Sequence, residues 1–167
     1  AWPQRFPKAT PFEHHGLPDY TSFYTFNDDV AAENIEFLIQ CYQALGERRV
    51  LEPITRAMTA FLVMQQGAPQ PGWALQYTHD LKPSGARTYE HPSLSGSESV
   101  GIVQYLMDLP SPSPEVVAAV ESAVAWFRAS KIEGLRIERR LVEGAPNGID
   151  VLVSPDPAAL PVWARFY

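Results

Sequence analysis

Three oxygen-bearing side chains, Asn27, Asp28 and Asp29, stand side by side immediately before a long apolar helical pattern. Asn and Asp at the start of a helix usually act as caps, because their oxygens accept hydrogen bonds from the first backbone N–H groups. One cap needs one residue, and two adjacent carboxylates repel each other unless a cation or the positive end of the helix offsets their charge. The stretch therefore predicts either a helix cap or a cation-binding site.

Further polar side chains lie in the loops that precede the other predicted helices. They are Gln76, His79, Asp80, Arg87, Glu90, Ser95, Ser97, Glu98 and Arg165. Oxygen donors without nearby cysteines or clustered histidines favour Ca²⁺ over zinc. Taken singly, each residue is more commonly a solvated loop side chain. A functional site requires that several of them converge, as loops do at one end of stacked helical hairpins.

The apolar periodicity predicts a first pair of antiparallel helices. The first helix spans 30–45, where apolar residues recur every three or four positions and a glycine, Gly46, follows. The second begins at Pro53, a residue suited to a first helical turn, and ends near Gln66. The short connection between them indicates a helical hairpin. The predicted core faces are Ala31, Ile35, Leu38, Tyr42 and Leu45, then Ile54, Met58, Phe61 and Leu62.

A second hairpin follows an irregular stretch at 67–94. Its first helix opens with a capping-box pattern, Ser95-Gly96-Ser97-Glu98, and its second opens with Ser113-Pro114-Glu115. The predicted buried face of the last helix is Val117, Val120, Val124 and Phe127. Alternating patterns at 132–142 and 149–153 predict a small β ribbon.

The two hairpins form an internal repeat. Trp2-Pro3-Gln4 precedes the first, Trp73-Ala74-Leu75-Gln76 precedes the second 71 residues later, and Trp163-Ala164-Arg165-Phe166-Tyr167 is a third such entry. Repeated hairpins of one size predict a mainly α fold of stacked pairs, either a solenoid or a closed toroid. The chain is therefore interpreted as a segment, 1–167, of one larger catalytic domain.

Composition narrows the possible partners. With 13 Lys plus Arg against 19 Asp plus Glu, the net charge is −6, and no basic stripe for nucleic acid is present. No apolar run reaches membrane-spanning length. The pair His14-His15 is interpreted as solvated loop residues. Cys41 is expected in the core, and as a single cysteine it excludes an internal disulfide.

Five segments together resemble the bacterial pectate lyases of polysaccharide lyase family ten. They are 2–4 (WPQ), 25–29 (TFNDD), 72–77 (GWALQY), 85–99 (GARTYEHPSLSGSES) and 163–167 (WARFY). The resemblance implies part of an α/α toroid-like barrel that cleaves polygalacturonate by β-elimination with Ca²⁺. It also implies an anionic polysaccharide as partner and a secreted protein, and the chain is expected to be monomeric.

The resemblance suggests roles for individual residues. Arg165, in the segment WARFY, resembles the catalytic base of the family, which removes the C5 proton of a sugar. Asp28 and Asp29 are similar to its Ca²⁺ or substrate-bridging ligands. The family often has an aspartate where this chain has Thr78, so either Asp80 substitutes as a metal ligand or the Ca²⁺ site is weakened. Substrate contacts are expected from Asn27, Arg87, Glu90, Ser95 and Glu98. Since arginine holds its proton far above neutral pH, an arginine base implies an alkaline optimum.

Two alternatives stay open at this point. A helical-toroid glycoside hydrolase would use paired carboxylates that flank the scissile bond, for which Asp28, Asp80 and Glu98 are candidates. A non-catalytic uronan-binding or structural module would bind polygalacturonate without turnover.

Overall fold

The computed structural model describes residues 2–6, 16, 19–145 and 148–167, so His14 and His15 lie outside the described residues. The helices are α1 (Val30–Leu45), α2 (Leu51–Met64), α3 (Gly96–Met107) and α4 (Pro114–Ser130), with 3-10 turns η1 (Asn27–Asp29) and η2 (Arg48–Val50). The strands are β1 (Tyr24–Thr25), β2 (Trp73–Ala74), β3 (Gln76–Tyr77), β4 (Pro83–Ser84), β5 (Leu94–Ser95), β6 (Leu135–Leu141) and β7 (Ile149–Pro155). Two compact units result: Ala1–Trp126 with Arg165–Tyr167, and Phe127–Ala164.

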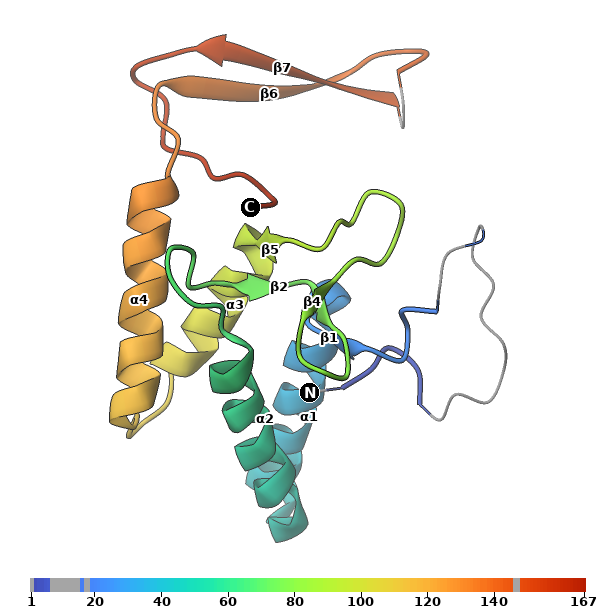
Figure 1. Cartoon of the computed structure of the whole chain (residues 1–167), viewed down its shortest axis with the longest axis vertical. Coiled ribbons are helices and arrows are strands. Elements are labelled where there is room, and N and C mark those ends of the chain that lie inside the picture. Colours follow the sequence, from blue (N-terminus) through green and yellow to red (C-terminus); the bar gives the residue numbers. More distant parts are fainter. Residues whose placement is uncertain (1, 7–15, 17–18, 146–147) are drawn as a thin grey trace. The chain divides into compact units, whose positions relative to one another are not determined.

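The first hairpin forms as predicted, with α1 and α2 side by side in Figure 1. Gly46 closes α1 in the left-handed conformation that glycine adopts without steric cost. Helix α2 begins two residues earlier than predicted, at Leu51. Pro53 still fits, because the first turn of a helix has no intrahelical acceptor for its N–H groups.

The predicted core face of this hairpin is only partly correct. In α1, Ala31 and Ile35 are buried, whereas Tyr42 and Leu45 are exposed. In α2, the buried residues are Ala57, Phe61 and Met64. Burial is therefore concentrated where the two helices meet the loops that carry the small strands. Cys41, expected in the core, is only half-buried on the distal part of α1.

Helix α4 buries a different face from the predicted one. Its buried residues are Val116, Ala119, Ala123 and Trp126, one position before each predicted residue, which corresponds to a rotation of about 100°. The cause is close packing from another loop. Gly72 lies against the Trp126 ring so tightly that a Cβ there would come within 2.4 Å of it.

The buried segment 73–77 positions the strands that precede α1 and α3. Trp73 is fully buried, and its indole N–H donates to the Phe61 carbonyl of α2 at 2.8 Å. The Tyr77 hydroxyl donates to the Met64 carbonyl at 2.8 Å. Strand β2 pairs with β5, and β3 pairs with both β1 and β4. The strands before α1 and α3 are thus fixed to one stretch of chain.

Backbone pairing supports the internal repeat. Thr25 pairs with Gln76, three residues after Trp73, and Ser95 pairs with Phe166, three residues after Trp163. In the same register, Phe26 N–H donates to the Leu75 carbonyl (2.8 Å) and Gly96 N–H donates to the Arg165 carbonyl (3.1 Å). Each tryptophan entry therefore holds the strand that opens the preceding hairpin. Closure into a toroid stays a prediction.

The second unit contains the predicted β ribbon. Strands β6 and β7 are antiparallel, with Ile137 opposite Val153. The Trp163 indole N–H donates to the Phe127 carbonyl at 2.8 Å within this unit. Among the described residues, no helix is both long and apolar enough to cross a membrane.

Candidate functional site

A buried carboxylate, Glu90, is the centre of a polar network at the start of α1. Its side chain is inaccessible to solvent. Its Oε1 accepts from the Asn27 amide at 3.0 Å and from Arg87 Nη2 at 2.5 Å. Its Oε2 accepts from the Arg87 backbone N–H at 3.1 Å and from Arg87 Nε at 2.9 Å. The four donors compensate for the burial of this charge.

The loop 85–90 gives Arg87 and Glu90 their relative positions. Ala86 N–H donates to the Glu90 carbonyl at 3.0 Å, and Glu90 N–H donates to the Arg87 carbonyl at 2.8 Å. Gly85 permits this tight turn, since a Cβ at this position would lie 2.8 Å from the Glu90 carbonyl oxygen. The glycine thus brings the backbone close enough for the two side chains to form a bidentate pair.

The Arg87 guanidinium links this buried carboxylate to the surface. Its Nη2 also reaches both Asp28 carboxylate oxygens, at 3.1 and 3.2 Å, and its side chain is 31% exposed. Among the described residues, no acceptor contacts Nη1. The arginine is therefore held in place by two carboxylates while one end of its planar fork remains available to an anion from solution.

Asp29 occupies the N-cap position of α1, but the side chains of Asp28 and Asp29 do not make the capping hydrogen bonds considered from the sequence. Neither side chain caps a helix, and both residues have positive φ, 53° and 57°. Non-glycine residues rarely adopt this left-handed conformation, and Asp is among the few that tolerate it. The geometry turns Asp28 towards Arg87. Consecutive strained residues of this kind are a feature of functional sites.

The charges in the network fix its protonation. Burial by itself would raise the pKa of the Glu90 carboxyl, but the hydrogen bonds and charge of Arg87, with the Asn27 amide, hold that pKa below its usual value. The hydrogen bonds to Glu90 and Asp28 raise the pKa of Arg87 further above its ordinary range, against the opposing effect of burial. Arg87 is consequently a permanent cation and Glu90 a permanent anion at neutral pH.

Two tyrosines that were not predicted from the sequence lie beside this network. Tyr20 is buried, and burial raises the pKa of its phenol, while the charge of Arg87 lowers it and those of Glu90 and Asp28 raise it. Tyr89 is exposed, with its ring 5.4 Å from the Arg87 Cζ. Tyr89 lies between two selected residues, so its position alone could have pointed to it. Tyr20 had no comparable signal.

A second polar group lies at the start of α3. Ser95 is the N-cap residue, as predicted, but its buried hydroxyl donates to the Glu98 carboxylate instead of capping a backbone N–H. The Arg165 carbonyl accepts from Gly96 N–H at the same helix start, while the exposed Arg165 guanidinium packs over the Phe166 ring at 5.1 Å. Asp29 and Glu98 line one groove between α1 and α3. The starts of the two helices therefore face a common hollow.

Asp80 is not part of either group. It lies in the turn between β3 and β4, where its carboxylate accepts from the Thr78 hydroxyl at 2.5 Å and from Lys82 at 2.7 Å. These contacts hold the pKa of Asp80 at about 2, the Lys82 hydrogen bond having the larger effect. Thr78 thus orients Asp80 within the turn.

The predicted calcium ligands do not form a shared cage. Among the described residues, no three His, Cys, Asp or Glu side chains are grouped so that they could hold a metal ion. Asp28 is bound to Arg87, and Asp80 is bound to Lys82. Because Ca²⁺ requires six to eight oxygen ligands, these residues do not fit a site built from this part of the chain alone. Their role as ligands stays a prediction.

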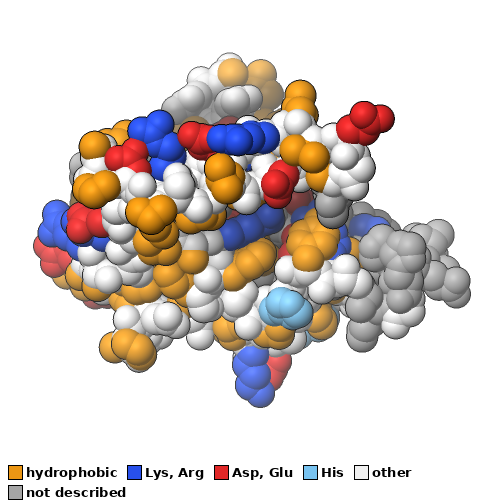
Figure 2. Space-filling model, turned by 90° about the horizontal axis from the view of Figure 1, so that it is seen from above, with side chains coloured by type: hydrophobic (Ala, Val, Ile, Leu, Met, Phe, Trp, Pro, Cys, Tyr) orange, Lys and Arg blue, Asp and Glu red, His pale blue; other side chains and the backbone are white. Residues whose placement is uncertain are grey.

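Lys and Arg side chains are interspersed with Asp and Glu on the face shown in Figure 2. The Asp28–Arg87–Glu90 network has the same alternation, with the guanidinium between two carboxylates. The guanidinium of Arg87 is the cation of this network, and its Nη1 is the nitrogen that neither carboxylate contacts.

Comparisons with known proteins agree on one group of enzymes. The sequence profile of the family described as pectic acid lyase matches residues 1–167. A family 10 polysaccharide lyase from Cellvibrio cellulosa has 29% sequence identity and a TM-score of 0.68, over 92% of this chain and 50% of that chain. A mutant of a family 10 lyase from the same organism, in complex with trigalacturonic acid, has 28% identity and a TM-score of 0.69, over 99% of this chain and 54% of that one. No curated protein matches. The chain thus spans about half the length of these solved structures.

Proposed function

The chain belongs to the pectic acid lyase family, and on that basis we propose that it is the part of a pectate lyase that binds polygalacturonate and helps to cleave it by β-elimination. The observation that carries the proposal is the Arg87 guanidinium, pinned by Glu90 and Asp28 with Nη1 directed to no described acceptor. A uronate carboxylate can accept a charge-assisted hydrogen bond from this nitrogen. The complex of a related lyase with trigalacturonic acid supports this class of substrate.

The proposed reaction removes the proton at C5 of a galacturonosyl residue. The C5–H bond breaks, a C4=C5 double bond forms, the C4–O glycosidic bond breaks, and the departing oxygen takes up a proton. The C5 proton is α to the carboxylate, so its loss places further negative charge on a group that is already anionic. A fixed cation at this carboxylate stabilises that charge. Arg87 can provide part of this stabilisation because its partners hold it in position.

Arg165 is proposed as the base that accepts the C5 proton. Its backbone is fixed by the hydrogen bond from Gly96 at the start of α3, while its side chain is exposed. A side chain placed in this way can reach a substrate without being buried. The proposed alkaline optimum follows from the high proton affinity of arginine. Ser95, Glu98 and Asn27 are proposed to shape the site, since the structure bonds them to other side chains.

Calcium dependence is proposed from the family and not from a ligand cage in this chain. Ca²⁺ supplies charge neutralisation at uronate groups when it is bound. In this chain Asp29 is exposed and offers a carboxylate beside Asp28, and the substrate would have to contribute further oxygens. The proposed protein is secreted, because a polysaccharide too large to enter a cell is cleaved outside it. A monomer is proposed as well.

The test is the ultraviolet absorbance of polygalacturonate incubated with the protein at alkaline pH, with Ca²⁺ and then with a chelator. A rise shows the conjugated C4=C5 product. Arg165→Ala is expected to lower the rate by about 10²- to 10⁴-fold, the usual contribution of a general base. Arg128→Ala, which alters an exposed arginine of α4, serves as the control. Equal rates for the two variants would contradict the role of Arg165.

Two observations keep a binding module as the second candidate: the chain covers half of the solved lyases, and the carboxylates of its described residues form no metal cage. Binding of polygalacturonate without an absorbance change would identify such a module. No observation favours a glycoside hydrolase, because Asp28, Asp80 and Glu98 are each bonded to a different neighbour.

A further inference from the structure

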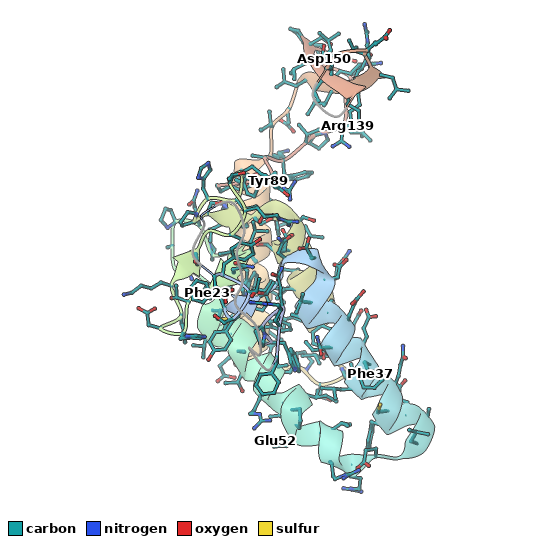
Figure 3. The ribbon with its side chains drawn as sticks, turned by 90° about the vertical axis from the view of Figure 1, so that its right-hand side faces the viewer. Phe23, Phe37, Glu52, Tyr89, Arg139 and Asp150 are labelled. Atoms are coloured by element: carbon teal, nitrogen blue, oxygen red, sulfur yellow. The ribbon has the colours of Figure 1, made fainter. Side chains whose placement is uncertain are left out.

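Tyr89 is exposed to solvent and lies beside Arg87, the residue proposed to bind a uronate carboxylate. The residue is 53% exposed, although it lies within the tightly hydrogen-bonded turn at 85–90. The Arg87 guanidinium carbon lies 5.4 Å from the centre of its ring, within range of a cation–π contact. Figure 3 shows Tyr89 at the end of its unit opposite Glu52, which lies by the turn between α1 and α2. An exposed aromatic ring therefore lies next to the cation at the site.

The ring is held in place before any ligand binds. Arg87 is fixed by its bidentate contact with Glu90 and by Asp28, so the cation–π partner of Tyr89 does not move. The loop is closed by hydrogen bonds between Ala86, Arg87 and Glu90. A tyrosine has only two side-chain torsions, and a preformed contact lowers the entropy lost on binding. The energetic cost of presenting this ring to a ligand is therefore small.

We propose that Tyr89 is a sugar-binding residue that stacks against the C–H face of a galacturonosyl ring whose carboxylate lies on Arg87. This inference rests on the proposed function and specifies how the same site recognises its substrate. A pyranose ring exposes carbon-bound hydrogens on one face and carries its charged carboxylate at the rim. An aromatic ring and an adjacent guanidinium match these two features. Arg87 recognises the charge, and Tyr89 recognises the ring.

The two contacts respond differently to salt, which allows them to be separated. Ionic strength screens the attraction between a guanidinium and a carboxylate. Stacking removes apolar surface from water and does not depend on charge. Salt therefore weakens the contribution of Arg87 and leaves that of Tyr89 unchanged.

The experiment measures the KM and kcat for polygalacturonate, and the Kd for trigalacturonate, in Tyr89→Ala, Tyr89→Phe and Tyr42→Ala. Tyr42 on α1 is 41% exposed and lies outside the network, so it is the matched control. Tyr89→Ala is expected to raise KM and Kd about five- to tenfold, as for loss of roughly 50 Å² of buried apolar surface. Its kcat should stay within about twofold of wild type. Tyr89→Phe keeps the ring and should bind like wild type.

Three results overturn the inference. If Tyr89→Ala binds as tightly as Tyr42→Ala while the wild-type protein binds its substrate, the site has no stacking residue. If the loss in Tyr89→Ala disappears at about 0.5 M salt, where screening is strong, Tyr89 serves only to position Arg87. Failure of the wild-type protein to bind or cleave polygalacturonate would overturn the proposed function itself, and this inference with it.

Discussion

Replacing Arg87 by alanine tests whether the buried Glu90 carboxylate depends on its guanidinium partner for stability. Glu90 would keep only the Asn27 amide as a side-chain donor, at 3.0 Å. Removing one partner of a buried ion pair costs about 3 to 5 kcal/mol, because the remaining charge is left uncompensated. Since the Arg87 side chain is 31% exposed, solvent screening places the expected loss near the lower end, about 3 kcal/mol.

The assay is thermal and denaturant unfolding followed by circular dichroism. For a chain of this size, a loss of about 3 kcal/mol corresponds to a fall of roughly 6 to 12 °C in Tm. The control is Arg56→Ala, which breaks the ion pair between Arg56 and Glu52 on α2, where both side chains are about two-thirds exposed. That pair should contribute less than about 0.5 kcal/mol. Similar losses in the two variants would refute the reasoning.

The difference in unfolding free energy between the wild-type protein and Arg87→Ala should change with pH in a direction that the pKa of Glu90 determines. In the wild-type protein the pKa of Glu90 is lowered, so its contribution to stability is present above the unfolded-state pKa and is lost as the pH falls through the folded-state value. Without Arg87, burial raises the pKa of Glu90, and the folded variant binds a proton more readily than the unfolded chain. The difference in unfolding free energy between the two proteins should therefore shrink from about pH 7 to about pH 4. A constant or growing difference would contradict the assignment.

Two further predictions concern the core that aligns the helix starts. Gly72→Ala places a Cβ 2.4 Å from the buried Trp126 ring and should lower the unfolding free energy by about 1 to 3 kcal/mol. Gly101→Ala has nothing within 4 Å and should raise it by up to about 1 kcal/mol, as expected for a helix interior; denaturant titration compares the two. Tyr77→Phe removes the hydrogen bond to the Met64 carbonyl and should cost about 1 to 3 kcal/mol. In the wild type, burial raises the pKa of Tyr77 to about 12, so ultraviolet titration should show a phenol that does not ionise at pH 10.

Local sequence signals were sufficient for the bounds of α1, but not for those of α2 or for all of the buried faces. Helix α1 has its predicted bounds because an apolar period ends at a glycine that can adopt positive φ. The buried face of α4 was predicted one residue too far along, because Val and Phe are larger and more apolar than Ala. Packing of the Trp126 ring of α4 against Gly72 selected the alanine face instead. That choice depends on a residue more than forty positions away, which periodicity cannot detect.

At the candidate site, too, the residues could be predicted from the sequence, whereas their bonding partners could not. Asn27, Asp28, Arg87 and Glu90 were selected because charged and amide side chains preceded the helices, and the structure brings these four together. Their bonding was not predictable, because it depends on the turn at 85–90. Asp80 was selected on the same grounds, yet a local contact with Lys82 keeps it apart.

The repeat explains how a single backbone arrangement can position side chains with different functions. Leu75 and Arg165 each lie two residues after a tryptophan. The Leu75 carbonyl accepts a hydrogen bond from the N–H of Phe26, just before α1, and the Arg165 carbonyl accepts one from the N–H of Gly96, at the start of α3. In the first repeat the side chain is an apolar leucine that is 1% exposed. In the second it is an exposed arginine. Since the hydrogen bonds involve only the backbone, the side chain at this position can change without loss of the frame. The proposed base therefore occupies a position whose geometry the fold already secures through main-chain pairing, and Arg165→Ala should lower the rate by about 10²- to 10⁴-fold while preserving the pairing with β5.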